Sequence, residues 1–260
     1  MRLCQRDSAS CGACCGLYNR PDPSRAAVRE ELCRRTRALE GVPRTPADFR
    51  AAARALEASA PPSLFPSVRV CTLLGFLDPG ETRVGCLAHP AVTGGPDLRD
   101  CGVYDASICE TFLCPSFSWL SEEEAALAEE AAGDFHLYGL VVTDVPFLRA
   151  VLAAVADGAG ARVERRHLAE RRFRAALHRL LALKEELAPG SEGLFGAFAA
   201  GPGGEDRPRR IDYDAIGRAG SRYDVILTHA GADPRSGNDL DRLEDEIRHR
   251  LDAAVAVFPA

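Results

Sequence analysis

The placement of the cysteines constrains this chain more than any other feature of its sequence. Ten cysteines occur in 260 residues, and all ten lie within the first 114. The densest stretch reads Cys11-Gly12-Ala13-Cys14-Cys15, and Cys33 lies further on; Cys4 precedes them, and a second group comprises Cys71, Cys86, Cys101, Cys109 and Cys114. Thiols gathered in one half of a chain either pair as disulfides or bind a metal.

The remaining composition favours the metal. The chain is 46% hydrophobic and 27% charged, which is ordinary for a globular protein. It has neither an apolar segment of membrane-spanning length nor an apolar N-terminal signal segment. We therefore expect a cytoplasmic protein without a membrane partner, in a compartment where disulfides do not normally persist. The net charge of −6 argues against a nucleic-acid partner.

Helix start and stop signals are clear in several places. Ser24 is a suitable N-cap and Gly41 a suitable C-terminal glycine, Thr45 precedes Pro46, and Ser121 forms a capping box with Glu124. Together with apolar periodicity, these signals predict helices over residues 24–40, 46–59, 121–133, 145–157, 167–187 and 238–257.

The other segments are less regular. Residues 67–118 are rich in Gly, Pro and Asp, which predicts mostly loops with a short strand near 68–71. Residues 137–142 are compatible with strand or helix, 188–210 with a linker, and 223–227 with a strand. We expect a mainly α fold with little β: an irregular, loop-dominated, cysteine-rich metal-binding module (1–118), with a mainly helical half (119–260) packed on it.

The Cys11-x2-Cys14 spacing is one at which two thiolates on a tight turn bind a metal centre. Neighbouring side chains point in different directions, so either Cys14 and Cys15 serve two centres, or one of them lies outside the ligand shell or is a bridging ligand. Cys33 falls within a predicted helix and suits a core role, whereas Cys101 fits either reading. His89 suits a structural role better than that of a ligand. The other eight cysteines lie in loop-like positions, which a core role explains poorly.

The ordered cysteine blocks carry a resemblance to a known family. Cys11-Gly12-Ala13-Cys14-Cys15-Gly16, then Gly85-Cys86, then Cys109 and Cys114 resemble the YkgJ-type CxxCxxCC cysteine-cluster proteins, a putative zinc- or iron-chelating family. The resemblance covers about residues 1–118, and the spacing from Cys4 to Cys11 is longer than in the family. It implies a chelating set of Cys4, Cys11, Cys14, Cys15, Cys71, Cys86, Cys109 and Cys114. Relatives of this module also occur in a flagellin lysine methylase associated with an iron–sulfur cluster.

The residues leave the identity of the metal open. Zinc prefers four ligands in a closed tetrahedral set, and a [4Fe–4S] cluster also takes four thiolates. The many cysteines, few histidines and irregular loops favour an iron–sulfur cluster, in an electron-transfer or structural role with an unidentified protein or redox partner. The alternatives are a zinc-chelating structural protein and a lysine-methylase-like enzyme that uses the cluster. The enzyme alternative predicts an open site near Asp97, Arg99 and Tyr104.

Overall fold

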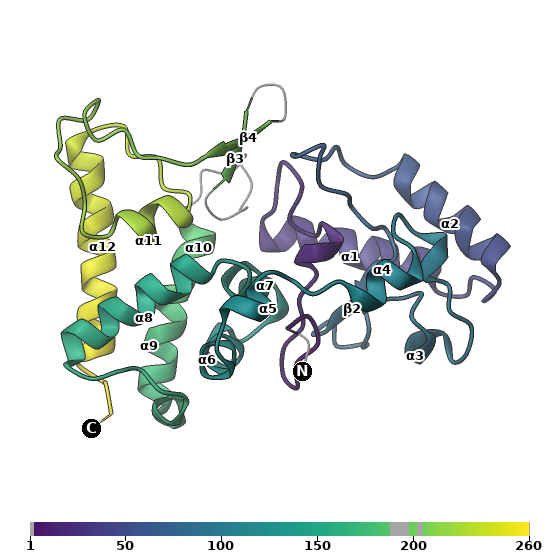
Figure 1. Ribbon diagram of the computed structural model, residues 1–260, viewed down its shortest axis with the longest axis horizontal. Coiled ribbons are helices and arrows are strands. Elements are labelled where there is room, and N and C mark those ends of the chain that lie inside the picture. The colour runs from purple at the N-terminus through teal and green to yellow at the C-terminus, as the bar shows by residue number, and fades with distance from the viewer. Residues whose placement is uncertain (1–2, 188–197, 202–204, 260) are drawn as a thin grey trace.

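The computed structural model describes residues 3–187, 198–201 and 205–259. Its helix content is 52% and its strand content 6%, which confirms the prediction of a mainly α fold. The molecule is elongated, with helices α1–α4 at one end, α8–α12 at the other and α6–α7 between them (Figure 1). The cysteine-bearing part of the chain thus occupies one end and the middle.

The first helices begin and end where the capping signals place them. A 3-10 turn, η1, spans Ala13–Cys15, and α1 spans Arg25–Leu39. The hydroxyl of Ser24 caps α1, and Gly41 follows it with a φ of 76°. Helix α2, Pro46–Ala58, is capped by Thr45. These predictions succeed because caps are local hydrogen-bonding rules.

The segment from 67 to 118 is more regular than predicted. No strand forms at 68–71; instead β1 (Leu74–Phe76) and β2 (Val84–Cys86) pair as an antiparallel hairpin, with Leu74 opposite Cys86. The expected loops also contain short helical pieces, namely α3 (Pro90–Thr93), η2 (Arg99–Cys101), α4 (Ala106–Thr111) and α5 (Ser116–Trp119). Each piece has at most six residues, too few for a helical period to be read from the sequence.

The remaining helices form a packed array. They are α6 (Glu122–Ala132), α7 (Phe135–Val142), α8 (Val145–Ala159), η3 (Arg165–Ala169), α9 (Arg171–Leu181), α10 (Leu183–Glu186), α11 (Asp224–His229) and α12 (Gly237–Val255). Helix α6 has the predicted capping box between Ser121 and Glu124, and Gly133 ends it with a φ of 79°.

Four expectations for this half need correction or refinement. The predicted helix over 167–187 is divided into η3, α9 and α10, and the ambiguous segment 137–142 is helical within α7. The predicted strand over 223–227 is wrong, because those residues belong largely to α11. Of the expected linker 188–210, residues 188–197 and 202–204 lie outside the described residues. The rest includes a small hairpin of β3 (Phe198–Ala200) and β4 (Asp206–Pro208).

The largest hydrophobic cluster joins both parts of the chain. It consists mainly of residues from α6 to α12, but Leu3, Ala9 and Cys11 from the N-terminal segment are part of it. Two smaller clusters lie between α1, α2 and the β1–β2 hairpin, and α7 contributes Phe135 and Leu140 to one of them. The N-terminal segment is therefore anchored on the helical array by apolar burial.

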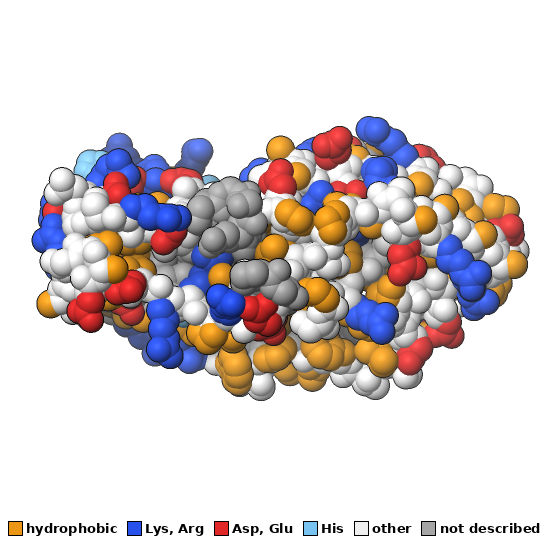
Figure 2. Space-filling model, turned by 90° about the horizontal axis from the view of Figure 1, so that it is seen from above, with side chains coloured by type: hydrophobic (Ala, Val, Ile, Leu, Met, Phe, Trp, Pro, Cys, Tyr) orange, Lys and Arg blue, Asp and Glu red, His pale blue; other side chains and the backbone are white. Residues whose placement is uncertain are grey.

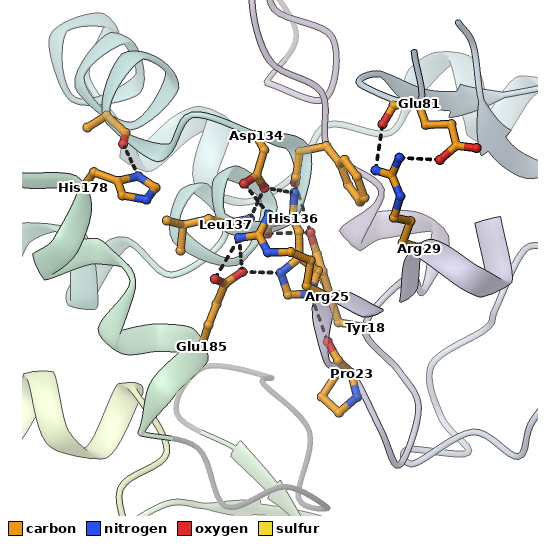
Figure 3. A network of polar contacts seen from close by, with 12 residues as sticks. Tyr18, Pro23, Arg25, Arg29, Glu81, Asp134, His136, Leu137, His178 and Glu185 are labelled. Atoms are coloured by element: carbon orange, nitrogen blue, oxygen red, sulfur yellow. Dashed lines mark hydrogen bonds and ion pairs between the residues drawn. The ribbon is translucent and has the colours of Figure 1, made fainter. Parts of the chain in front are cut away.

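A partly buried polar network fastens α1 to α7 and α10 (Figure 3). The Arg25 guanidinium pairs with Asp134 and donates to both oxygens of Glu185, at 2.7 and 2.8 Å. His136, which is 1% exposed, bridges Glu185 and the Pro23 carbonyl, the latter at 2.9 Å. Burial raises the pKa of Glu185, but contacts with His136 and Arg25 outweigh it and lower that pKa. The network fixes the two ends of the molecule against each other.

No single helix among the described residues has the length and apolar character needed to cross a membrane. Helices α7 and α8 meet that criterion only as a pair, and they are bent by 93°.

Candidate metal centre

One cavity of about 620 Å³ brings together all eight thiols that the sequence predicts as ligands. The cysteines that line it are Cys4, Cys11, Cys14, Cys15, Cys71, Cys86, Cys109 and Cys114. Cys33 and Cys101 are absent from its lining. All ten cysteines lie in the described residues, and none of them is joined in a disulfide.

A tight turn presents the first group of thiols. The N–H of Cys11 donates to the Cys4 carbonyl at 3.1 Å, and η1 then carries Cys14 and Cys15. Gly16 ends the turn with a φ of 78°, and a Cβ there would lie 2.4 Å from the Arg69 carbonyl oxygen. The residue after the cysteine pair must therefore be glycine, for both its backbone conformation and its close approach to the 69–71 segment.

That close approach delivers the second group. The N–H of Cys71 donates to the Cys15 carbonyl at 2.9 Å, so a backbone hydrogen bond joins the two segments that carry these cysteines. The β1–β2 hairpin then places Cys86 opposite Leu74. Helix α4 carries Cys109 and begins at Asp105, whose carboxylate accepts from the Ile108 N–H at 2.8 Å.

The two excluded cysteines have other surroundings. Cys33, on α1, is partly buried and packs against an apolar cluster, in line with the expectation of a core role. Cys101 is buried at the end of η2, where its thiol donates to the Pro46 carbonyl at 3.5 Å. His89 lines the cavity, and its Nδ1 accepts from the Ala91 N–H at 3.2 Å to cap α3. That contact agrees with the structural role expected for His89.

Burial keeps most of the thiols protonated. It raises the pKa of Cys11 and of Cys86 to about 12 each, and that of Cys15 well above its usual range. Cys14 and Cys114 share a hydrogen bond that raises the pKa of Cys14 and lowers the pKa of Cys114 to about 6. Cys114 is therefore the thiol of this pair that loses its proton more readily, and a metal would have to displace protons from the buried thiols Cys11, Cys15 and Cys86.

The rest of the cavity wall is mostly apolar. Of the residues of the enzyme alternative, Arg99 and Tyr104 line the cavity. The Arg99 guanidinium is held by Asp97 at 2.6 Å and Glu110 at 3.2 Å, so two carboxylates already neutralise it. The Tyr104 hydroxyl donates to the Arg69 carbonyl at 3.4 Å.

The sequence reasoning overlooked an apolar rim. Lining residues that are also exposed are Leu77, Val92, Ile108, Phe112, Leu113 and Phe117. Phe112 is 52% exposed although it is aromatic. Hydrophobic side chains also gather along one long edge of the molecule, near the middle of its length (Figure 2). The signal in the sequence was the apolar pair Phe112-Leu113 before Cys114, because it follows directly after the six-residue helix α4 and stays exposed.

The eight thiols line the wall without forming a site for a single ion. In residues 3–187, 198–201 and 205–259, no group of three or more His, Cys, Asp or Glu side chains meets in an arrangement that holds one metal ion. The donor chemistry nevertheless fits a thiophilic centre, since sulfur donors outnumber every other kind of donor around the cavity.

Comparison with known protein families, with curated proteins and with solved structures gives no match for this chain.

Proposed function

We propose that this chain is a metal-binding protein that holds an iron–sulfur cluster through the cysteines of its N-terminal half, in an electron-transfer or structural role. One observation supports the proposal most: eight of the ten cysteines line one cavity, and they are the eight that the sequence predicts as ligands. Chance burial of small apolar side chains gives no reason for such a selection.

The size and wall of the cavity favour a cluster over a single zinc ion. A cavity of about 620 Å³ has room for a polynuclear centre, in which each thiolate binds a different iron. The apolar rim fits as well, because a hydrophobic shell limits solvent access and tunes the reduction potential of a cluster. When bound, the cluster would supply one-electron chemistry; the chain would hold it, exclude water and set its charge environment.

The wider setting follows from this assignment. The proposal includes membership of the CxxCxxCC cysteine-cluster proteins and a cytoplasmic location, where thiols stay reduced. An electron-transfer role requires a protein redox partner. Zinc chelation is the alternative that the same donors support, and the experiment below separates the two.

The test is metal and acid-labile sulfide content, with a visible spectrum, on protein purified without oxygen. Iron with equimolar sulfide and a broad visible absorption supports the proposal. Zinc without sulfide replaces it with the zinc alternative, and protein without metal after anaerobic reconstitution refutes it.

A matched pair of variants addresses the ligands. Cys15→Ser alters a thiol of the cavity, whereas Cys33→Ser alters one outside it. We expect Cys15→Ser to lose at least half of the iron and Cys33→Ser to keep all of it. Equal iron content in both variants would contradict the role of the cavity.

A further inference from the structure

The eight thiols fall into two groups of four, according to the apolar clusters they pack against, the backbone hydrogen bonds between their segments and the thiols that shift one another's pKa. The pKa of Cys15 is raised first by burial and then by the nearby Cys71, Cys86 and Cys109. Burial is also the largest cause of the raised pKa of Cys86 and of Cys109. Cys71 and Cys109 add to the increase for Cys86, and Cys71 adds to the increase for Cys109. Every pair within this group of four is therefore in electrostatic contact.

The other four thiols are linked through Cys11, which interacts with each of the other three. Burial is the largest cause of the raised pKa of Cys11, and a hydrogen bond from the Ala13 N–H opposes it. Cys114 and Cys4 add smaller increases. Cys14 is hydrogen-bonded to Cys114 and also feels Cys11. The contacts between the groups run through Cys15, to Cys11 and to its neighbour Cys14.

The packing of five of the eight thiols agrees with this division. Cys11 belongs to the large cluster formed by α6–α12, and Cys4 packs against it. Cys71 belongs instead to a cluster with α2 and with residues that flank the β1–β2 hairpin, and Cys15 and Cys86 pack against that one. Cys15 also packs against the cluster that joins α1, the hairpin and α7. The backbone agrees, because Cys11 donates to the carbonyl of Cys4 and Cys71 to that of Cys15.

The boundary between the groups is the peptide bond between Cys14 and Cys15. Both residues lie in η1, a 3-10 turn with three residues per turn, so their side chains diverge by about 120°. Two thiols that diverge in this way face different sides of the turn. One cysteine run that supplies ligands to two clusters is also how two-cluster ferredoxins are built.

We infer that the cavity holds two adjacent four-thiolate centres, one on Cys4, Cys11, Cys14 and Cys114 and the other on Cys15, Cys71, Cys86 and Cys109. The inference rests on the proposed function for its metal, and it adds the number of centres and the ligands of each. Two centres joined through consecutive ligands would exchange electrons with each other across one peptide unit.

The experiment is a set of single and double variants, measured by iron and sulfide per chain after anaerobic reconstitution. Two [4Fe–4S] centres give about eight irons and eight sulfides in the unaltered protein. Cys114→Ser and Cys109→Ser should each lose half. Cys86→Ser combined with Cys109→Ser should lose no more than Cys109→Ser alone, whereas Cys109→Ser combined with Cys114→Ser should lose all. Cys33→Ser is the control and should lose none.

The outcomes separate the inference from the proposed function. About four irons per chain, with every single variant losing all of them, would overturn the two centres and leave an iron–sulfur protein. Two zinc ions without sulfide, divided between the same two groups, would support the partition and refute iron. Protein without metal would refute both.

A measurement on the unaltered protein covers the case in which a variant fails to fold. Two reduced clusters this close would broaden each other's electron paramagnetic resonance signal through spin–spin coupling. A sharp spectrum from fully reduced protein that integrates to about one spin per chain would overturn the inference.

Discussion

Lys184 is the only lysine in the sequence, and it lies completely buried in the helical half. Its ammonium is 2.5 Å from a carboxylate oxygen of Asp144 and donates to the His229 carbonyl at 2.7 Å. Asp144 also caps α8 and accepts from the His229 ring at 2.7 Å. This buried group therefore joins α8, α10 and α11 at one point.

The change Lys184→Met keeps the length of the side chain and removes its charge. Asp144 is only 4% exposed, so its carboxylate would stay buried without the ammonium that neutralises it. Removing one partner of a buried ion pair costs about 3–5 kcal/mol. In a chain of this size, that loss lowers the melting temperature by about 10 °C.

Denaturant unfolding at pH 7, followed by circular dichroism at matched metal content, measures the cost. The double variant Lys184→Met with Asp144→Asn is the control, because asparagine keeps the helix cap while removing the stranded charge. We expect the double variant to be more stable than Lys184→Met alone. A loss below about 1 kcal/mol in the single variant, or a double variant that loses the sum of both single changes, would refute the buried-charge reasoning.

Three further predictions concern acid stability, the cavity rim and the cysteine turn. Burial raises the pKa of Asp144, but its cationic partners outweigh burial and hold that pKa at about 2. The ionised carboxylate therefore contributes roughly 2 kcal/mol to the free energy of unfolding, and acid titrations should show this contribution above pH 4 and its loss between about pH 4 and pH 2. Phe112→Ser and Phe117→Ser should keep full iron content but lose their visible absorption faster in air than the unaltered protein; equal bleaching rates would contradict a shielding role for the rim. Gly16→Ala should cost about 1–3 kcal/mol and lower metal content, since its Cβ would collide with the Arg69 carbonyl; full metal retention would contradict the close approach.

The parts of the fold that local rules govern were predictable. Ser24, Thr45 and Ser121 begin helices as expected, because each cap is decided within four residues of sequence. The strand predicted for Tyr223–Leu227 was wrong because long-range packing, and not local sequence, decides its structure. Its β-branched and aromatic residues suit a strand, but Ile226 and Leu227 pack into the core cluster as one face of a short helix. Tertiary burial outweighed local preference there.

The long-range polar contacts could not be predicted from the sequence. Asp144 and Lys184 are 40 residues apart, and His136 and Glu185 are 49 apart. Each of these residues alone resembles an ordinary surface charge or helix cap. Their pairing depends on how α7, α8 and α10 meet, which no local pattern encodes.

The thiols show the same division between local and global information. The sequence set Cys33 apart because it falls within a predicted helix, and it left Cys101 open; the eight cysteines that the family resemblance implied as ligands are the eight that line the cavity. The adjacency of Cys14 and Cys15 indicated either two centres, or one cysteine that is a bridging ligand or lies outside the ligand shell. It did not indicate which other cysteines would share a centre with each of them. That assignment needed the fold, because it follows from Cys71 pairing with the backbone of Cys15 and from Cys4 pairing with Cys11. If two centres are present, the second one depends on a contact between Cys15 and Cys71, which are more than 50 residues apart in sequence. The short turn Cys11–Gly16 would then supply ligands to both centres.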